Sequence, residues 1–173
     1  MKMIDKPLEG EYSPYAIMYI NLLPGDKMVL QHLQENYEAI KNLIAPLPEE
    51  KLLYSYAPGK WTIKETLVHI IDDERIFAYR ALRIARNDKT PLPGFEQDDY
   101  VPYSKANERS LDSIFAEYDA VRTSTILLFN SFNNDDFLRT GVANGHIVSV
   151  RALAYHIAGH ELHHLNIIKT KYL

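Results

Sequence analysis

The sequence predicts an all-α protein, a four-helix bundle with a long crossover between its second and third helices. Apolar residues recur at three- and four-residue spacings in four long segments, which is typical of helices with one buried face. Segments rich in Pro, Gly and Asn separate these patterns, and strand-like alternation is scarce. No repeat or domain boundary interrupts the chain, so we expect residues 1–173 to form a single domain.

The first two helices are predicted at residues 26–45 and 62–86. The first carries an apolar stripe and ends at Pro46 and Pro48, because proline cannot continue a helix. The second begins at Thr62 with Glu65 three residues later, a capping box that satisfies two backbone N–H groups at the helix start. This second helix is apolar nearly all round, which predicts burial on several sides.

The third helix is predicted at residues 109–132, before a polar stop at residues 133–136, and the fourth runs from Ser149 nearly to Leu173. Residues 87–108 between the second and third helices are long enough to travel back along the bundle. Such a crossover makes these two helices parallel, whereas a short turn would make them antiparallel. The crossover is rich in acidic and aromatic residues, so it either lines a site or simply packs on the bundle.

Composition excludes several classes of function. The net charge is only −4 and no cluster of Lys and Arg occurs, which argues against a nucleic-acid partner. The chain has no cysteine, which excludes disulfides, cysteine metal ligands and a protein thiol nucleophile and fits a reducing cytoplasm. No apolar run approaches the roughly 18 residues that span a bilayer, and the first residues lack a signal region. We therefore expect a cytoplasmic protein with no membrane partner.

Four of the seven histidines fall within residues 155–164, in a segment with helical periodicity. On a helical wheel His160 and His164 point inward, and because they are four residues apart they share one face and could hold one metal ion. His156 and His163 lie nearer the edge or solvent. The alternative for the whole cluster is a set of surface and hydrogen-bonded histidines without a metal.

A third ligand must come from a facing element, and His69 in the second helix is the strongest candidate. Asp72 and Asp73 follow it one turn on, where either could orient an imidazole, complete the coordination or take a proton. The alternative for the two aspartates is a solvated or salt-bridged helix face. His32 and His146, the latter in a glycine-flanked loop, show no partner spacing and are interpreted as structural or solvent-facing.

Arginines recur at helical spacing on the second helix, at Arg75, Arg80, Arg83 and Arg86. One of them could hold the carboxylate of a cofactor if this helix borders a pocket. Pairing with Asp or Glu, or exposure to solvent, is the more common situation for such residues and is the interpretation we favour.

The sequence resembles the DinB family of damage-inducible, metal-binding four-helix proteins. The resemblance lies in residues 59–69, Asp72-Asp73-Glu74-Arg75, Asn144-Gly145-His146 and residues 160–164, and it extends over nearly the whole chain. It implies a single DinB-like domain with an up-down-down-up bundle and a metal between the helices. The family's three histidine ligands fall on His69, His160 and His164. Homodimers and a role in stress response are also implied.

The resemblance further implies a reaction, because the superfamily includes bacillithiol and mycothiol S-transferases and thiol-dependent isomerases, and some members are described as metal-dependent hydrolases. Three neutral imidazoles leave open positions on a divalent ion, for which zinc, nickel and iron are all suitable. A low-molecular-weight thiol bound there would lose its proton and attack an electrophilic small-molecule substrate.

We expect this S-transferase reaction ahead of two alternatives, a hydrolase that uses metal-bound hydroxide and a non-enzymatic metal-binding bundle. A closed structural site would have no exchangeable metal position, whereas either reaction requires one. Asp72 or Asp73 would support either reaction, and the sequence does not choose between them.

Overall fold

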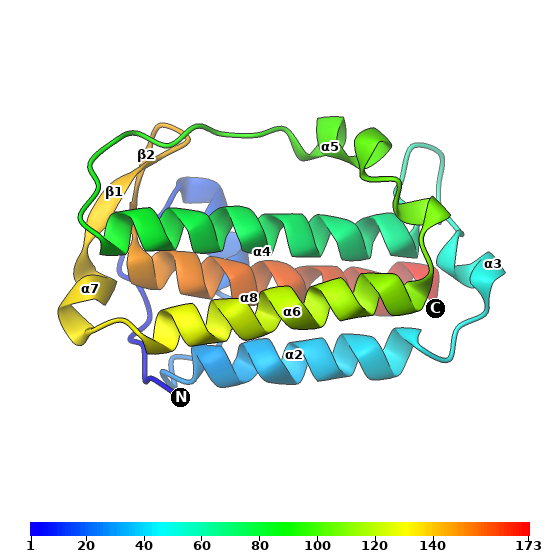
Figure 1. The fold of residues 1–173 in the computed structure, drawn as a ribbon, viewed down its shortest axis with the longest axis horizontal. Helices are drawn as coiled ribbons and strands as arrows, with labels where there is room; N and C mark the ends of the chain where they lie inside the picture. The colour runs from blue at the N-terminus through cyan, green and yellow to red at the C-terminus, as the bar shows by residue number, and fades with distance from the viewer.

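A computed structural model describes residues 1–173 and shows four long helices packed side by side (Figure 1). They are α2 (Val29–Ile44), α4 (Ile63–Ala85), α6 (Leu111–Asn130) and α8 (Val150–Ile167). The all-α bundle is therefore confirmed, with each helix end within a few residues of its predicted position except at the C-terminus. There α8 continues as a π-helical turn, η3 (Ile168–Tyr172).

The direction of the helices agrees with the predicted crossover. In Figure 1, α2 and α8 run in one direction while α4 and α6 run in the other, which is an up-down-down-up bundle. The segment after α4 returns along the full length of the bundle before α6 begins, and it contains α5 (Gln97–Ser104) and η2 (Ala106–Glu108). None of the residues of α5 is buried, so this helix lies on the surface of the bundle.

Local sequence explains where the long helices begin. The side chain of Thr62 accepts a hydrogen bond from the Glu65 backbone N–H at 3.1 Å, and the Glu65 carboxylate accepts one from the Thr62 N–H at 2.8 Å. This is the predicted capping box, and it starts α4 seven residues before His69. At the start of α8, Ser149 accepts a hydrogen bond from the Ala152 N–H at 3.1 Å.

The structure corrects the prediction for residues 139–149. A two-stranded antiparallel hairpin, β1 (Thr140–Ala143) and β2 (His146–Ser149), precedes α8, so His146 begins a strand and does not lie in a loop. Asn144 and Gly145 form its turn with positive φ angles of 50° and 75°. An Asn-Gly pair is the usual hairpin turn, because both positions require the left-handed region that asparagine and glycine tolerate best.

Short helical segments close the remaining sides of the bundle. The N-terminal η1 (Pro14–Ala16) and α1 (Ile17–Ile20) pack on α8, while α3 (Glu49–Leu52) and α7 (Asn134–Leu138) lie in the connections of the bundle. The apolar core forms two clusters, each built from parts of α2, α4, α6 and α8. No helix has both the length and the apolar character needed to cross a bilayer.

Candidate metal centre

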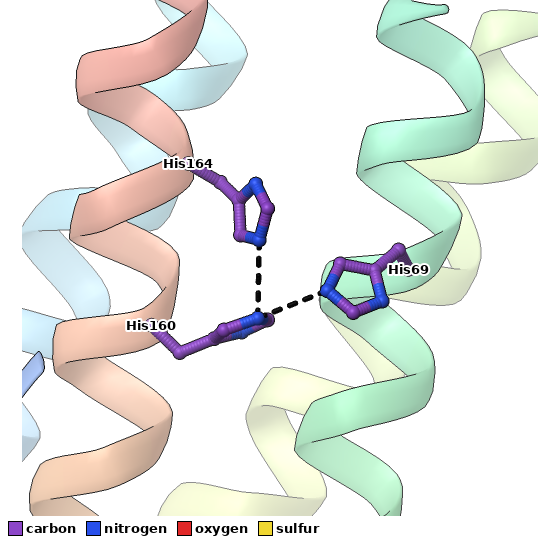
Figure 2. Close-up of side chains that lie close together, drawn as sticks. All are labelled: His69, His160 and His164. Atoms are coloured by element: carbon purple, nitrogen blue, oxygen red, sulfur yellow. Dashed lines mark hydrogen bonds between the residues drawn. The ribbon is translucent and has the colours of Figure 1, made fainter. Parts of the chain in front are cut away.

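Three histidines from two helices converge between α4 and α8 (Figure 2). His160 and His164 lie one turn apart on α8, and His69 faces them from α4. The His160 Nε2 atom is 2.9 Å from His69 Nε2 and 3.1 Å from His164 Nε2. One nitrogen from each residue lies within 4.8 Å of the other two. The structure thus brings together the three residues that the sequence singled out as ligands.

The surroundings of this histidine trio favour neutral imidazoles. Burial lowers the pKa of His69 and, more strongly, the pKa values of His160 and His164. Neighbouring imidazoles lower the pKa of His160 further, because two imidazolium charges in contact would repel each other. Neutral imidazole offers a lone pair to a metal, so these three converging nitrogens fit a divalent transition metal.

Asp73 and Asp72 point to different sides of α4. The Oδ2 atom of Asp73 lies 3.3 Å from His160 Nδ1, on the side of the ring opposite the trio, and only 4% of Asp73 is exposed. Asp72 is partly exposed and lies 3.8 Å from Arg75 on the next turn, and burial raises the pKa of its carboxyl. Asp73 is therefore the carboxylate that can keep the proton on His160 Nδ1 and direct Nε2 toward a metal.

The position expected for His156 was wrong. Only 4% of this residue is exposed, and its ring stacks on Phe77 with centroids 3.7 Å apart. Its Nε2 atom lies 3.5 Å from Asp73 Oδ2, and its ring lies nearly parallel to that of His160 with centroids 5.7 Å apart. The N-terminal segment covers this side of α8, a contact that the periodicity of α8 alone does not contain. His163 is partly exposed, as expected.

Tyr19, on α1, is a residue of the site that the sequence analysis missed. Its ring makes edge-to-face contacts with His156, His160 and His163, with centroids 5.2 to 5.4 Å apart. Burial and the nearby Asp73 carboxylate raise the pKa of the Tyr19 hydroxyl to about 12, so the phenol stays protonated at neutral pH. Tyr19 lies before the first predicted helix, where no periodic pattern indicated a packed element.

A cavity of about 260 Å³ opens beside His160 and Asp73. Arg80 and Phe77 of α4 line it, as do Tyr15 and Tyr19 of the N-terminal segment. A second cavity, of about 280 Å³, borders His164 and is lined by Trp61, Tyr56, Tyr172 and Lys60 among others. Gln97 and Asp98 of the crossover border both cavities, so the crossover lines the site in addition to packing on the bundle.

The other histidines, and most of the arginines singled out in the sequence, form ion pairs or are exposed to solvent. His32 pairs with Asp26 at 2.8 Å near the start of α2, and His146 is exposed on the hairpin. Arg75 pairs with Glu117 and Arg83 with Asp88, as favoured from the sequence. Arg86, which follows α4, is exposed, and Arg80 is the only buried residue among the four arginines singled out in the sequence.

Comparison with known proteins places the whole bundle in a family. A sequence model described as the DinB superfamily matches residues 32–168, from the first turn of α2 to the end of α8. The matched segment includes all three histidines of the trio and both aspartates of α4. It therefore covers every residue predicted to bind or support a metal.

Two individual proteins are similar over most of the chain. A protein of Oceanobacillus iheyensis named "Putative metal-dependent hydrolase" is 27% identical over 144 residues, which are 81% of each chain. The structure of YfiT from Bacillus subtilis, described as a probable metal-dependent hydrolase with an unusual four-helix bundle topology, superposes with a TM-score of 0.75. That match covers 95% of this chain and 89% of YfiT at 15% identity, so it concerns the fold.

Proposed function

This chain belongs to the DinB superfamily, and we propose that it is a metal-dependent hydrolase of small esters or amides. The observation that carries the proposal is the convergence of His69, His160 and His164 beside an open cavity. Three protein ligands leave at least one position on a divalent ion for water or substrate, which is the arrangement of catalytic metal sites. The name of the Oceanobacillus iheyensis relative supports the same reaction class.

Each residue of the site would have a defined task. The trio would hold the divalent ion, which supplies Lewis-acid activation of water and of a substrate carbonyl. Asp73 would orient His160 by accepting a hydrogen bond from its Nδ1–H group. Tyr19 and Phe77 would exclude water from the inner wall of the cavity.

Thiol transfer, which we expected ahead of hydrolysis from the sequence, stays a prediction and is our second candidate. One observation favours it: cavities border the trio on two sides, one at His160 and one at His164. A low-molecular-weight thiol could occupy one cavity and an electrophile the other. The thiol must be supplied from outside, because the chain has no cysteine.

Metal content provides the first test. We expect about one equivalent of a divalent transition metal in untagged protein, by elemental analysis, and little in His69→Ala or His164→Ala. His163→Ala is the matched control, since it removes a neighbouring imidazole on the same helix and should retain the metal. Equal losses from all three variants would contradict the assignment of the ligands.

Activity then separates the candidate functions. The metal-loaded protein should hydrolyse 4-nitrophenyl esters, and the rate should fall to background after chelation and in His69→Ala. The same protein is then tested with low-molecular-weight thiols and an alkylating agent. Metal-dependent consumption of thiol without ester hydrolysis would favour transfer, and a tightly held metal with no exchangeable position would favour a structural site.

A further inference from the structure

Arg80 differs from the other buried arginines because it has no carboxylate partner. Three arginines are buried, and two of them pair with acidic residues: Arg122 with Glu74 and Glu161, and Arg151 with Glu11. Arg80 is 5% exposed, and its one hydrogen bond goes from Nη2 to the Pro93 carbonyl at 2.8 Å. Burial lowers its pKa, although an arginine keeps its charge at any physiological pH.

The guanidinium of Arg80 is held in place by its neighbours. Its central carbon lies 4.7 Å from the ring centroid of Phe77 and 5.8 Å from that of Phe95. Phe77 belongs to α4 and Phe95 to the crossover, so two elements and the Pro93 hydrogen bond restrict this side chain. A guanidinium carries five N–H donors, and only the Nη2 atom of Arg80 donates a hydrogen bond within the protein. A fixed cation with free donors is prepared to bind an anion.

Arg80 lines the same cavity as His160 and Asp73. It also borders a small apolar recess of about 20 Å³, room for about one water-sized group, which Tyr12, Leu153 and Val148 line in part. The remaining charged groups of the main cavity are carboxylates: Asp73 at the trio, and Glu96 and Asp98 on the exposed crossover. A phosphate dianion would be repelled by these three groups more strongly than a monoanion would be. The charge distribution therefore favours a single carboxylate at the Arg80 end.

We propose that Arg80 binds a carboxylate group of the substrate, and that the rest of the same molecule lies in the cavity of about 260 Å³ between Arg80 and His160. This inference rests on the proposed function, since it assigns a substrate class to the cavity beside the trio. The substrate is then a small monocarboxylate whose scissile bond lies toward His160. Arg80 acts as a specificity residue, because it selects molecules by charge at a distance from the metal.

The test compares phenylacetate with phenylacetamide, a neutral molecule of the same shape, by isothermal titration calorimetry. Both are titrated into the protein as purified and again after chelation, which shows whether binding requires the metal. We expect phenylacetate to bind about tenfold or more tightly than the amide in both states. Inorganic phosphate should compete poorly.

Variants assign this preference to Arg80. Arg80→Gln should remove the preference for the acid, and Arg80→Lys should weaken it because lysine lacks the planar fork. Arg83→Gln is the matched control: Arg83 lies on the next turn, pairs with Asp88 and borders neither cavity, so the preference should persist. If Arg80→Gln does not fold, two measurements still test the inference: the affinities of the parent protein for the acid and the amide, and the same two affinities of Arg80→Lys.

Equal affinity for the acid and the amide would overturn the inference, as would an equal effect of Arg80→Gln and Arg83→Gln. Tighter binding of phosphate than of phenylacetate through Arg80 would overturn the monocarboxylate class. Arg80-dependent binding in a protein that hydrolyses no ester would refute only the proposed function. Ester hydrolysis without any preference for the acid would refute only this inference.

Discussion

Asp73 and Asp72 are adjacent in sequence, but only Asp73 lies behind a histidine of the trio. Successive helical residues are separated by about 100° around the axis, so one carboxylate faces α8 while the other faces Arg75. Asp73 lies between His160 Nδ1 at 3.3 Å and His156 Nε2 at 3.5 Å. We propose that this buried carboxylate favours a proton on His160 Nδ1, which would leave His160 Nε2 free to bind a metal.

Asp73→Asn should weaken metal binding by about 10- to 100-fold, because a neutral amide oxygen attracts the Nδ1 proton of His160 less strongly than a carboxylate does. Asp72→Asn changes the same group one residue away and should leave the affinity nearly unchanged. Competition with a chromophoric chelator measures both constants. Comparable losses in the two variants would show that Asp73 does not orient the ligand.

The N-terminal segment is joined to the site by a close approach of α1 to α8. A Cβ atom at Gly159 would lie 2.3 Å from the backbone oxygen of Tyr19, so glycine is required for this contact. The contact places the Tyr19 ring over His156, His160 and His163. One glycine in α8 therefore allows a segment distant in sequence to form a wall of the cavity.

Gly159→Ala should destabilise the protein or displace α1. Alanine favours a helix by up to about 1 kcal/mol relative to glycine, but overlap with backbone that cannot yield costs about 1–3 kcal/mol. We expect a net loss in the free energy of unfolding, measured with urea. Gly25→Ala is the matched control, because nothing lies within 4 Å of its Cβ position. A stabilised Gly159→Ala variant would show that α1 is not held at this point.

Across the bundle, a buried ionic network joins all four long helices. Arg122 of α6 pairs with Glu74 of α4 at 2.8 Å and Glu161 of α8 at 2.5 Å, and it also donates to the Leu33 carbonyl of α2. The Tyr118 hydroxyl donates to Glu161 as well. Leu33 and Tyr118 of this network belong to different apolar clusters, and Glu161 directly follows His160 in sequence. The helix that supplies two of the trio is thereby fixed to the other helices at a position about 100° around its axis from His160.

Arg122→Met should cost about 3–5 kcal/mol of stability, since it leaves the buried Glu74 carboxylate without its cation and removes a hydrogen bond to Glu161. Glu161→Gln should cost much less at pH 6. Burial raises the pKa of Glu161 to about 7, so the native side chain is mostly protonated there and glutamine resembles it. Urea unfolding of both variants at pH 6 measures the difference. Equal losses would contradict the protonated state assigned to Glu161.

The four helices, the capping box at Thr62, the parallel crossover and the pairing of His160 with His164 could all be predicted from sequence. These features depend on residues a few positions apart, through helix periodicity and side-chain capping. The local sequence is therefore enough to predict them. The prediction of His69 rested on the two aspartates that follow it one turn on, Asp72 and Asp73, and on the resemblance to a family. The hairpin was missed although Asn144-Gly145 indicates its turn.

The choice of Asp73 over Asp72, the burial of His156 and the position of Tyr19 followed only from the folded molecule. So did the isolation of Arg80 and the network around Arg122. Each depends on how far one helix is rotated and shifted against another, which is decided by packing between segments as distant as α1 and α8. Local sequence therefore specifies which groups the bundle contains, and the packing of its helices decides which of those groups meet.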